Sequence, residues 1–397
     1  MSESNRITLL PNRFHTFGRR RSEEAIFTER LTASHKEFLK QFLHDPPPPK
    51  GDPEFDLERI VGDKAVKAVT KEGAIHFHAV GDTGKGTHTP QEDVARAMIA
   101  DCPTGGNKVG PAFLLHMGDV TYGPHKQNVL YRTQFYEPYT DYSRKIIAIA
   151  GNHDGDSYPV TDPDPLDAFL KNFCDDVQSP VNFSDGIEHS TMDLPGVYWR
   201  MRCPFIDIIG LYSNRLENPG MIEGGKPVQG TPVNSAQKDF LTQTLKNIAT
   251  ERKAGKSRAL LIAVHHPPYS GGGHIGSADM LDDIDDCCNQ AKIMPDAFLS
   301  AHAHNFQRFT RRITFGGKDR RIPFVVAGGG GRGITSIKAK TGTTVGDHRL
   351  EQYDPGYGYL LVSATPETLT IQYTAVNGTD KNPFDSVTVD LATSRFI

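Results

Sequence analysis

Five short apolar segments recur along the chain, and each leads into a polar residue of a type that binds metal ions. The segments span residues 75–80, 112–117, 145–150, 259–264 and 297–301. Apolar runs of this length predict buried strands, and segments with helical spacing, such as 91–99 and 235–245, lie between them. Strands that alternate with helices predict an α/β fold whose core strands are largely parallel.

The residues that follow these predicted strands are carboxylates, an amide and imidazoles. They are Asp82, Asp119, Asn152, His153, His265, His302 and His304. In α/β folds ligands bind beside the carboxyl ends of the strands, so we expect these side chains to meet in one cleft. Carboxylate and amide oxygens suit hard cations, whereas imidazoles suit Fe, Zn and Mn. A carboxylate that bridges two cations about 3.5–4 Å apart lets the pair hold a phosphoryl group, and Asp119 is the natural bridge.

Five sequence blocks, in the order GDTG, GDVTY, GNHD, VHH and AHAH, carry a family resemblance. In this order they resemble the blocks of the calcineurin-like metallophosphoesterases, over residues 75–364. The resemblance implies an α/β fold in four layers, α/β/β/α, with two mixed β-sheets flanked by helices. Ala301 replaces the glycine that is usual before His-x-His, which is a small departure.

Two positions indicate the purple acid phosphatase branch of this family. Gly84 stands where many members have a histidine ligand, and Tyr122 stands where the branch places a tyrosinate on ferric iron. The resemblance implies that Asp82, Tyr122 and His304 bind the first metal. Asp119 would bridge to a second metal held by Asn152, His265 and His302. A hard tyrosinate favours a trivalent ion, so the implied cofactors are Fe(III) and a divalent Fe, Zn or Mn.

The resemblance also implies two histidines that face the substrate. His153 would stabilise charge on the phosphoryl group or protonate the leaving oxygen. His274 lies nine residues after His265 and follows a glycine run, 271–273, that allows close approach to a ligand. The implied reaction is in-line attack on phosphorus by a hydroxide that bridges the metals. From the residues alone, Arg332 in the glycine-rich stretch 328–333 could also reach a phosphate.

Other interpretations of the same residues are weaker. GDTGKGT, at residues 81–87, looks like a nucleotide-binding P-loop, but Gly86 follows Lys85 where such a loop needs Ser or Thr. His266 is expected to be a bystander, because only one of two adjacent strand residues can face the site. The four aspartates at 282, 283, 285 and 286 are expected to form a solvated helix face rather than a second cation site.

The predicted function is hydrolysis of a phosphate monoester, with a small-molecule phosphate ester as the substrate. A phosphodiesterase or nucleotide pyrophosphatase on the same centre is an alternative, because loops choose the leaving group. A metal-binding scaffold without turnover is a third. The formal net charge of -4 gives no field that favours nucleic acid or an anionic membrane. The oligomeric state is not predicted.

The predicted domain organisation is an N-terminal extension, residues 1–70 with a proline-rich stretch at 46–49, followed by the metallophosphoesterase domain, 71–397. The C-terminal third predicts hairpin-like strands at 306–315, 323–327, 357–364 and 369–375. The five cysteines are odd in number and scattered, which predicts free thiols. We see no signal peptide and no transmembrane run, so we expect a soluble, cytoplasmic protein.

Overall fold

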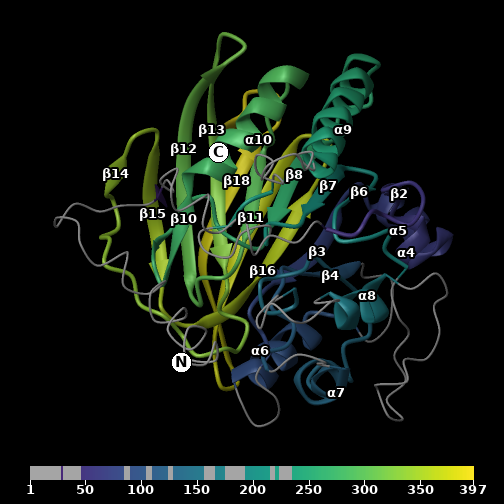
Figure 1. Cartoon of the computed structure of the whole chain (residues 1–397), viewed down its shortest axis with the longest axis vertical. Helices are drawn as coiled ribbons and strands as arrows, with labels where there is room; N and C mark the ends of the chain where they lie inside the picture. The colour runs from purple at the N-terminus through teal and green to yellow at the C-terminus, as the bar shows by residue number, and fades with distance from the viewer. Residues whose placement is uncertain are drawn as a thin grey trace, which may run out of the picture.

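The computed structural model of the chain describes residues 28–29, 46–84, 90–103, 110–123, 128–155, 166–174, 193–214, 220–222 and 235–397. Lys85 of the P-loop alternative lies outside these residues, as does most of the predicted extension. In the described part, two large mixed β-sheets and a set of helices confirm the predicted α/β fold (Figure 1).

The first large sheet has seven strands, and it contains three of the five predicted core strands. Its order is β19 (Arg395–Phe396), β18 (Asp380–Asp390), β17 (Thr368–Asn377), β16 (Tyr357–Ala364), β3 (Ile75–Val80), β4 (Phe113–His116) and β5 (Lys145–Ala148). The strands β3, β4 and β5 are parallel, whereas β16 to β19 form antiparallel hairpins. The parallel part therefore directs three strand ends to one edge of the sheet.

The second large sheet has nine strands and contains the other two predicted core strands. Its order is β14 (Thr344–Val345), β15 (His348–Asp354), β12 (Phe306–Phe315), β13 (Lys318–Ala327), β11 (Ala297–Ser300), β8 (Ala259–Val264), β7 (Ile206–Leu211), β6 (Trp199–Arg202) and β2 (Glu54–Asp56). The strands β13, β11, β8 and β7 are parallel to one another. A three-stranded sheet joins β1 (Thr28–Glu29), β10 (His274–Ser277) and β9 (Gly271–Gly272).

The described helices include both segments predicted from helical spacing, 91–99 and 235–245. They are α4 (Glu58–Val61), α5 (Asp63–Glu72), α6 (Pro90–Ile99), α7 (Asn128–Tyr131), a π-helical turn (Arg132–Tyr136), α8 (Asp167–Phe173), α9 (Ala236–Lys253) and α10 (Ala278–Ala291). The Ser277 hydroxyl caps α10 by accepting the N–H of Met280 at 3.2 Å. Figure 1 shows α9 and α10 side by side at the upper end of the molecule, and α6, α7 and α8 gathered at the lower end.

The acidic residues of α10 are not all solvated. Asp283 pairs with Lys238 of α9 at 2.8 Å, and Asp285 pairs with Arg311 of β12 at 2.6 Å. Asp282 and Asp286 are exposed. The expectation of a solvated face therefore holds for two of the four aspartates, while the other two join α10 to its neighbours.

The segment that precedes β3 is part of the sheet architecture. β2 pairs in parallel with β6 at the edge of the nine-stranded sheet, and α4 and α5 lead from it to β3. Residues 54–70 belong to the predicted extension, so this stretch packs on the main body. The predicted boundary at residue 71 itself stays a prediction.

One continuous hydrophobic core joins both large sheets, with Phe77 of β3 and Ile262 of β8 among its fully buried members. Burial of a side chain of this size contributes about 1.5–3 kcal/mol. All five cysteines are free, as predicted, and all five are buried. Among the described residues no helix is long and apolar enough to cross a membrane.

Candidate metal centre

The predicted ligand residues come from the ends of strands in both large sheets. Asp82, Asp119 and Asn152 follow β3, β4 and β5 of the seven-stranded sheet. His265 follows β8, and His302 and His304 follow β11, of the nine-stranded sheet. The side chains expected to meet in one cleft therefore come from two sheets, and the contacts below bring the two sets together.

The first group of donor atoms comprises Asp82, Tyr122 and His304. The Tyr122 hydroxyl donates to Asp82 Oδ1 at 3.0 Å and lies 3.3 Å from His304 Nε2. His304 Nε2 lies 3.5 Å from Asp82 Oδ1. His304 Nδ1 donates to the Gly333 carbonyl at 2.8 Å, which leaves the lone pair of Nε2 directed at the group when the ring is neutral. The structure thus brings together the three residues predicted for the first metal.

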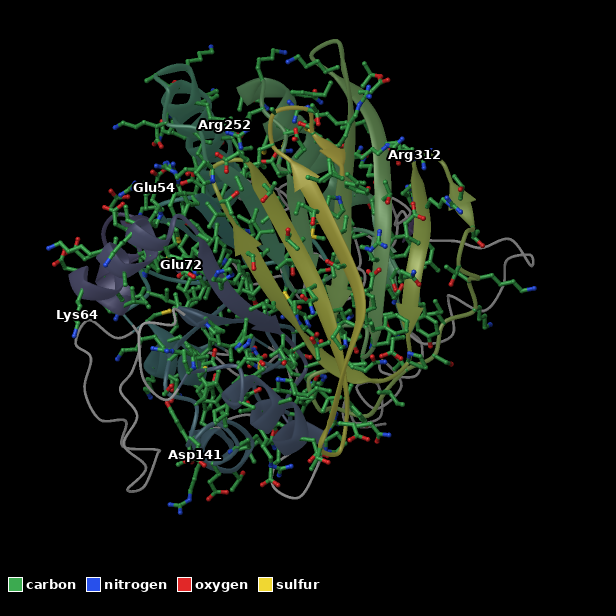
Figure 2. All side chains as sticks on the ribbon, turned by 180° about the vertical axis from the view of Figure 1, so that it is seen from behind. Glu54, Lys64, Glu72, Asp141, Arg252 and Arg312 are labelled. Carbon is green, nitrogen blue, oxygen red and sulfur yellow. The ribbon has the colours of Figure 1, made fainter. Side chains whose placement is uncertain are left out.

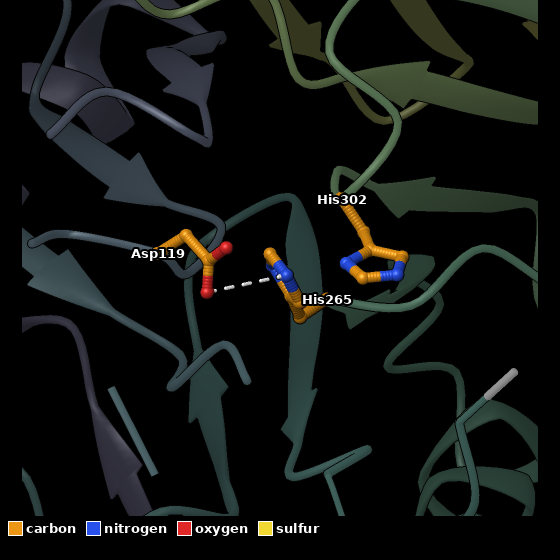
Figure 3. Close-up of side chains that lie close together, drawn as sticks. All are labelled: Asp119, His265 and His302. Carbon is orange, nitrogen blue, oxygen red and sulfur yellow. Dashed lines mark ion pairs between the residues drawn. The ribbon is translucent and has the colours of Figure 1, made fainter. Parts of the chain in front are cut away.

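The second group comprises Asp119, Asn152, His265 and His302. Ligand atoms of Asp119, His265 and His302 all lie within 4.8 Å of one another (Figure 3). His265 Nε2 is 3.4 Å from Asp119 Oδ1 and 3.1 Å from Asn152 Oδ1. Because His265 Nδ1 donates to the Met117 carbonyl at 2.8 Å, Nε2 of the neutral ring is an acceptor. Asp119 Oδ1, Asn152 Oδ1 and His265 Nε2 then converge as acceptors, and a cation satisfies such a set.

The two groups are adjacent. Asp82 Oδ2 accepts the backbone N–H of His302 at 2.7 Å, so one residue of the first group fixes the main chain of a residue in the second. Asp119 Oδ1 accepts the backbone N–H of His153 at 2.9 Å, which ties the loop after β4 to the loop after β5. Asp82, Asp119, His265 and His302 are all buried.

Burial and neighbouring charges set the protonation of these groups. Burial raises the pKa of Tyr122 well above its usual range, and the charges of Asp119 and Asp82 add to this effect, so the phenol is neutral without a cation. Burial and the surrounding histidines hold the pKa of His302 well below its usual range. Burial opposes protonation of His304, but its hydrogen bond and charge interaction with Asp82 raise its pKa overall.

The three residues predicted to face the substrate surround these groups. The His153 ring centroid lies 4.4 Å from that of Tyr122, and the His274 ring centroid lies 4.0 Å from that of His302. The Arg332 guanidinium lies over the Tyr122 ring, 4.3 Å from its centroid. The Arg332 backbone N–H donates to the Asp82 carbonyl at 2.9 Å, which fixes this stretch of chain beside the site. Among the described residues no carboxylate is paired with Arg332.

His266, the expected bystander, has its own partners. Its Nδ1 lies 3.0 Å from the Ser213 hydroxyl, and its ring centroid lies 4.4 Å from that of His302. His266 is fully buried, and burial holds its pKa well below the usual range. It therefore supports the wall of the site beside His302.

Two residues that the sequence interpretation did not assign hold the site loops. Asp154 accepts the N–H of Val120 at 3.0 Å and the N–H of Gly151 at 2.9 Å, so it joins the loops that carry Asp119 and Asn152. Gln134 accepts the N–H of Tyr122 at 2.7 Å and donates to its carbonyl at 3.0 Å. Asp154 is the last residue of the GNHD block, which is a signal that could have identified it, whereas Gln134 lies in no block.

The donor chemistry of the site fits a pair of cations. Oxygen donors of Asp82, Asp119, Asn152 and Tyr122 suit a hard ion, and the Nε2 atoms of His265 and His304 suit a transition metal. Backbone carbonyls fix the ring orientation of both imidazoles, as is usual for histidine ligands.

Solved structures with a similar fold include two that cover most of this chain. One is a purple acid phosphatase from yellow lupin (Lupinus luteus) seeds, with 17% identity and a TM-score of 0.53, covering 80% of this chain and 54% of that one. This chain therefore spans about half the length of that protein. The other is GAP50, the anchor in the inner membrane complex of Plasmodium, with 11% identity and a TM-score of 0.50, covering 79% and 89%. At these identities the likeness shows the fold alone.

A comparison with curated protein sequences finds no match to this chain. A comparison with protein families does find one. Residues 75–306, which are more than half of the chain and include all five sequence blocks, match the calcineurin-like phosphoesterases. Arg332 and its glycine-rich stretch lie beyond the matched residues. The match spans both groups of donor atoms, from Asp82 to His304. The chain therefore belongs to the calcineurin-like phosphoesterase family.

Proposed function

We propose that the protein is a binuclear metal-dependent phosphomonoesterase of the purple acid phosphatase type. Membership of the family makes it a phosphoester hydrolase. The observation that carries the proposal is the pair of adjacent donor groups, one with its three ligand atoms 3.0–3.5 Å apart and one with ligand atoms within 4.8 Å. In this proposal Asp82, Tyr122 and His304 hold the first cation. Asn152, His265 and His302 hold the second, and Asp119 bridges them.

The proposed cations are Fe(III) in the first position and a divalent Fe, Zn or Mn in the second. Two such cations acidify a bound water and neutralise charge on a phosphoryl group. The phenol of Tyr122 is buried and its pKa is raised, so a strongly charged ion beside it favours loss of its proton. This preference supports a trivalent ion beside Tyr122.

Three side chains are proposed to act on the substrate itself. His153 and His274 lie beside the two donor groups, where an imidazole can donate a hydrogen bond to a phosphoryl oxygen or a proton to the leaving oxygen. Arg332 has no carboxylate partner among the described residues, and its guanidinium can bind a phosphate oxygen in a charge-assisted hydrogen bond. The proposed partner is a small-molecule phosphate ester.

The test compares hydrolysis of a chromogenic phosphate monoester with that of the matching diester by the metal-loaded protein. We expect faster turnover of the monoester, and we expect His153→Asn to lower kcat about 100-fold or more, as is typical for loss of a general acid. Strict activity on the diester would assign the site to a phosphodiesterase instead. Metal-loaded protein that hydrolyses neither ester would rule out the proposed function and favour a metal-binding scaffold, since the fold alone does not determine activity.

A further inference from the structure

The hairpin that carries His274 is held by the side chain of one buried residue, Gln307 of β12. Gln307 Oε1 accepts the N–H of Gly271 at 2.7 Å. Its Nε2 lies 3.2 Å from the Gly272 carbonyl and 3.3 Å from the Ser270 hydroxyl. Gln307 is fully buried. One amide group therefore contacts three successive residues that lead to His274.

Gln307 is fixed from behind. Its backbone pairs with Val326 of β13 on one side and Tyr353 of β15 on the other, so it lies inside the nine-stranded sheet. Its Nε2 also donates to Asn305 Oδ1 at 2.8 Å, and Asn305 Nδ2 donates to the Thr335 carbonyl at 2.9 Å. A chain of buried and partly buried hydrogen bonds thus runs from β12 to both loops beside the donor groups.

The glycines before His274 allow a close approach to the segment 335–337. Gly273 has φ +88°, and a Cβ there would lie 2.4 Å from Thr335 Oγ1. Gly272 has φ +143°, and a Cβ there would lie 2.9 Å from Ile337 Cα. Side chains would push the hairpin away, so glycine is required at both positions. The hairpin is therefore clamped between Gln307 and this segment.

The clamp determines where His274 lies. His274 pairs with Gly272 across the hairpin, and its ring centroid lies 4.0 Å from that of His302. A side chain that acts on a substrate needs placement to within a fraction of an ångström, which residues behind it usually supply. A loop of three glycines without such support would leave His274 free to move.

We propose that Gln307 is a positioning residue of this site, which holds the His274 hairpin at the distance where His274 can contact a bound phosphoryl group. The role of His274 rests on the proposed function. The clamp on the hairpin, in contrast, is a property of the fold and can be tested without turnover. The clamp makes the hairpin a fixed wall of the site rather than a lid.

The first test is a double-mutant cycle between Gln307→Leu and His274→Ala. We expect Gln307→Leu to lower kcat/KM for the phosphate monoester about tenfold, because misplacement by 1 Å can cost about 100-fold. In the His274→Ala background, Gln307→Leu should not lower kcat/KM further, because both substitutions act through the His274 side chain. The control Gln243→Glu, at an exposed position on α9 bonded to Asn247, should keep the wild-type value. Equal losses from Gln307→Leu in both backgrounds would overturn the proposal.

The second test measures hydrogen exchange of the backbone amides at 271–275. We expect faster exchange in Gln307→Leu, because the Gly271 N–H loses its acceptor. Gln307→Glu replaces Gln307→Leu in this test if the latter does not fold. It keeps the acceptor for the Gly271 N–H, but it replaces the donor to the Gly272 carbonyl by an oxygen, which repels that carbonyl. Unchanged exchange in both variants overturns the proposal even in an active enzyme. If the wild type hydrolyses no ester, the proposed function fails, and exchange alone still decides whether Gln307 clamps the hairpin.

Discussion

At the scale of single residues, three proposed metal ligands have a left-handed backbone conformation, which residues other than glycine rarely adopt. Asp82, Asp119 and His302 have φ values of 56°, 54° and 66°. A left-handed conformation costs roughly 1–2 kcal/mol for an ordinary residue. Each of these residues lies two or three positions after the end of a core strand, so the turn aims the side chain across the gap between the sheets. Strain of this kind collects at functional sites, where surrounding structure enforces it.

The strain is offset at Asp82 by a nearly complete set of hydrogen bonds. Its N–H donates to the Gly118 carbonyl at 3.0 Å, and its carbonyl accepts the Arg332 N–H at 2.9 Å. Its carboxylate accepts the His302 N–H and the Tyr122 hydroxyl. The pKa of Asp82 is lowered overall, because contacts with His304, His265 and Tyr122 outweigh the effect of burial. The carboxylate is therefore ionised and ready to bind a cation.

Replacing Tyr122 by Phe tests the identity of the first cation. In protein loaded with iron, a phenolate on Fe(III) gives a charge-transfer band in the visible spectrum, and we expect Tyr122→Phe to abolish it. The measurement is the absorption spectrum together with the iron content of the purified protein. Tyr131→Phe is the matched control, because Tyr131 is equally buried and its hydroxyl has no hydrogen-bond partner among the described residues. A band that survives Tyr122→Phe would contradict the assignment of Tyr122 as a ligand.

The proposed ligand residues could be picked out from the sequence because they sit in short blocks, and their role as ligands stays a prediction. The sequence did not predict that Gln134, Asp154 and Gln307 support the site. Each of them binds backbone N–H groups of another segment, and the sequence does not show which segments will meet. A single Gln in a predicted strand does not indicate which backbone group its side chain will bind. Long-range hydrogen bonds of this kind follow only from the packed structure.

At the scale of elements, the end of β4 contains a histidine that burial keeps neutral. His116 is fully buried, its Nε2 lies 2.9 Å from the Thr83 hydroxyl, and burial lowers its pKa to about 3. The unfolded chain takes up a proton near pH 6.5, whereas the folded chain does so only near pH 3. The free energy of unfolding contributed by this group is therefore fully present above pH 6.5 and is lost as the pH falls toward 3.

A His116→Gln variant tests this contribution. Gln can keep the hydrogen bond to Thr83 but does not titrate, so the variant should lose less stability than the wild type when the pH is lowered from 7.5 to 5.5. Between these two pH values the difference between the proteins should come to about 1.4 kcal/mol in total. Urea unfolding of the metal-free proteins at both pH values measures this difference. The free energies of unfolding at pH 7.5 show how much the substitution changes packing, and that change is subtracted. Parallel pH dependences in the two proteins would refute the idea.

A second prediction concerns the elements at the edge of the nine-stranded sheet. Arg200 of β6 is fully buried and pairs with Asp207 of β7, Glu54 of β2 and Glu251 of α9, each at 2.9 Å. Arg200→Met leaves these carboxylates without their shared cation, and we expect a loss of about 3–5 kcal/mol in the free energy of unfolding. Figure 2 shows Glu54 and, at the other side of the molecule, Arg312.

Arg312 provides the control for this measurement because it is exposed on β12. Arg312→Met should change the free energy of unfolding by no more than about 0.5 kcal/mol. Urea denaturation of both variants decides the matter. Similar small losses at the two positions would mean that the buried ion network does not stabilise this edge.

The same network explains which strands sequence reasoning missed. The core strands at 75–80 and 259–264 were predicted with the observed bounds, because each is an uninterrupted apolar run. β6 reads WRMR and β7 contains Asp207, so neither looks like a buried strand. Their charges are buried only because Arg200 meets carboxylates from other elements. The polar start of β13, residues 318–322, was missed for a similar reason, since pairing with β12 rather than hydrophobicity defines it.

At the scale of the whole molecule, the proposed cations join the two sheets. Asp82, Asp119 and Asn152 extend from the seven-stranded sheet, and His265, His302 and His304 extend from the nine-stranded sheet. A ligand that binds only the folded state stabilises it by about 2.7 kcal/mol when its free concentration is 100 times Kd. Removal of metal by a chelator should therefore lower Tm, by roughly 2–4 °C for each kcal/mol lost.

Variants separate this effect from a general action of the chelator. His302→Ala removes one donor of the second group, so the difference in Tm between metal-loaded and chelated protein should shrink. Asp286→Asn is the control, because Asp286 is exposed on α10 and its pair with Lys238 is long, at 3.8 Å. That variant should keep the full shift, which also tests whether the acidic face of α10 contributes a cation site. Differential scanning fluorimetry with and without chelator gives both values. A shift that is the same in wild type and His302→Ala would mean that the stabilising ion binds elsewhere, and the two sheets would then need no metal between them.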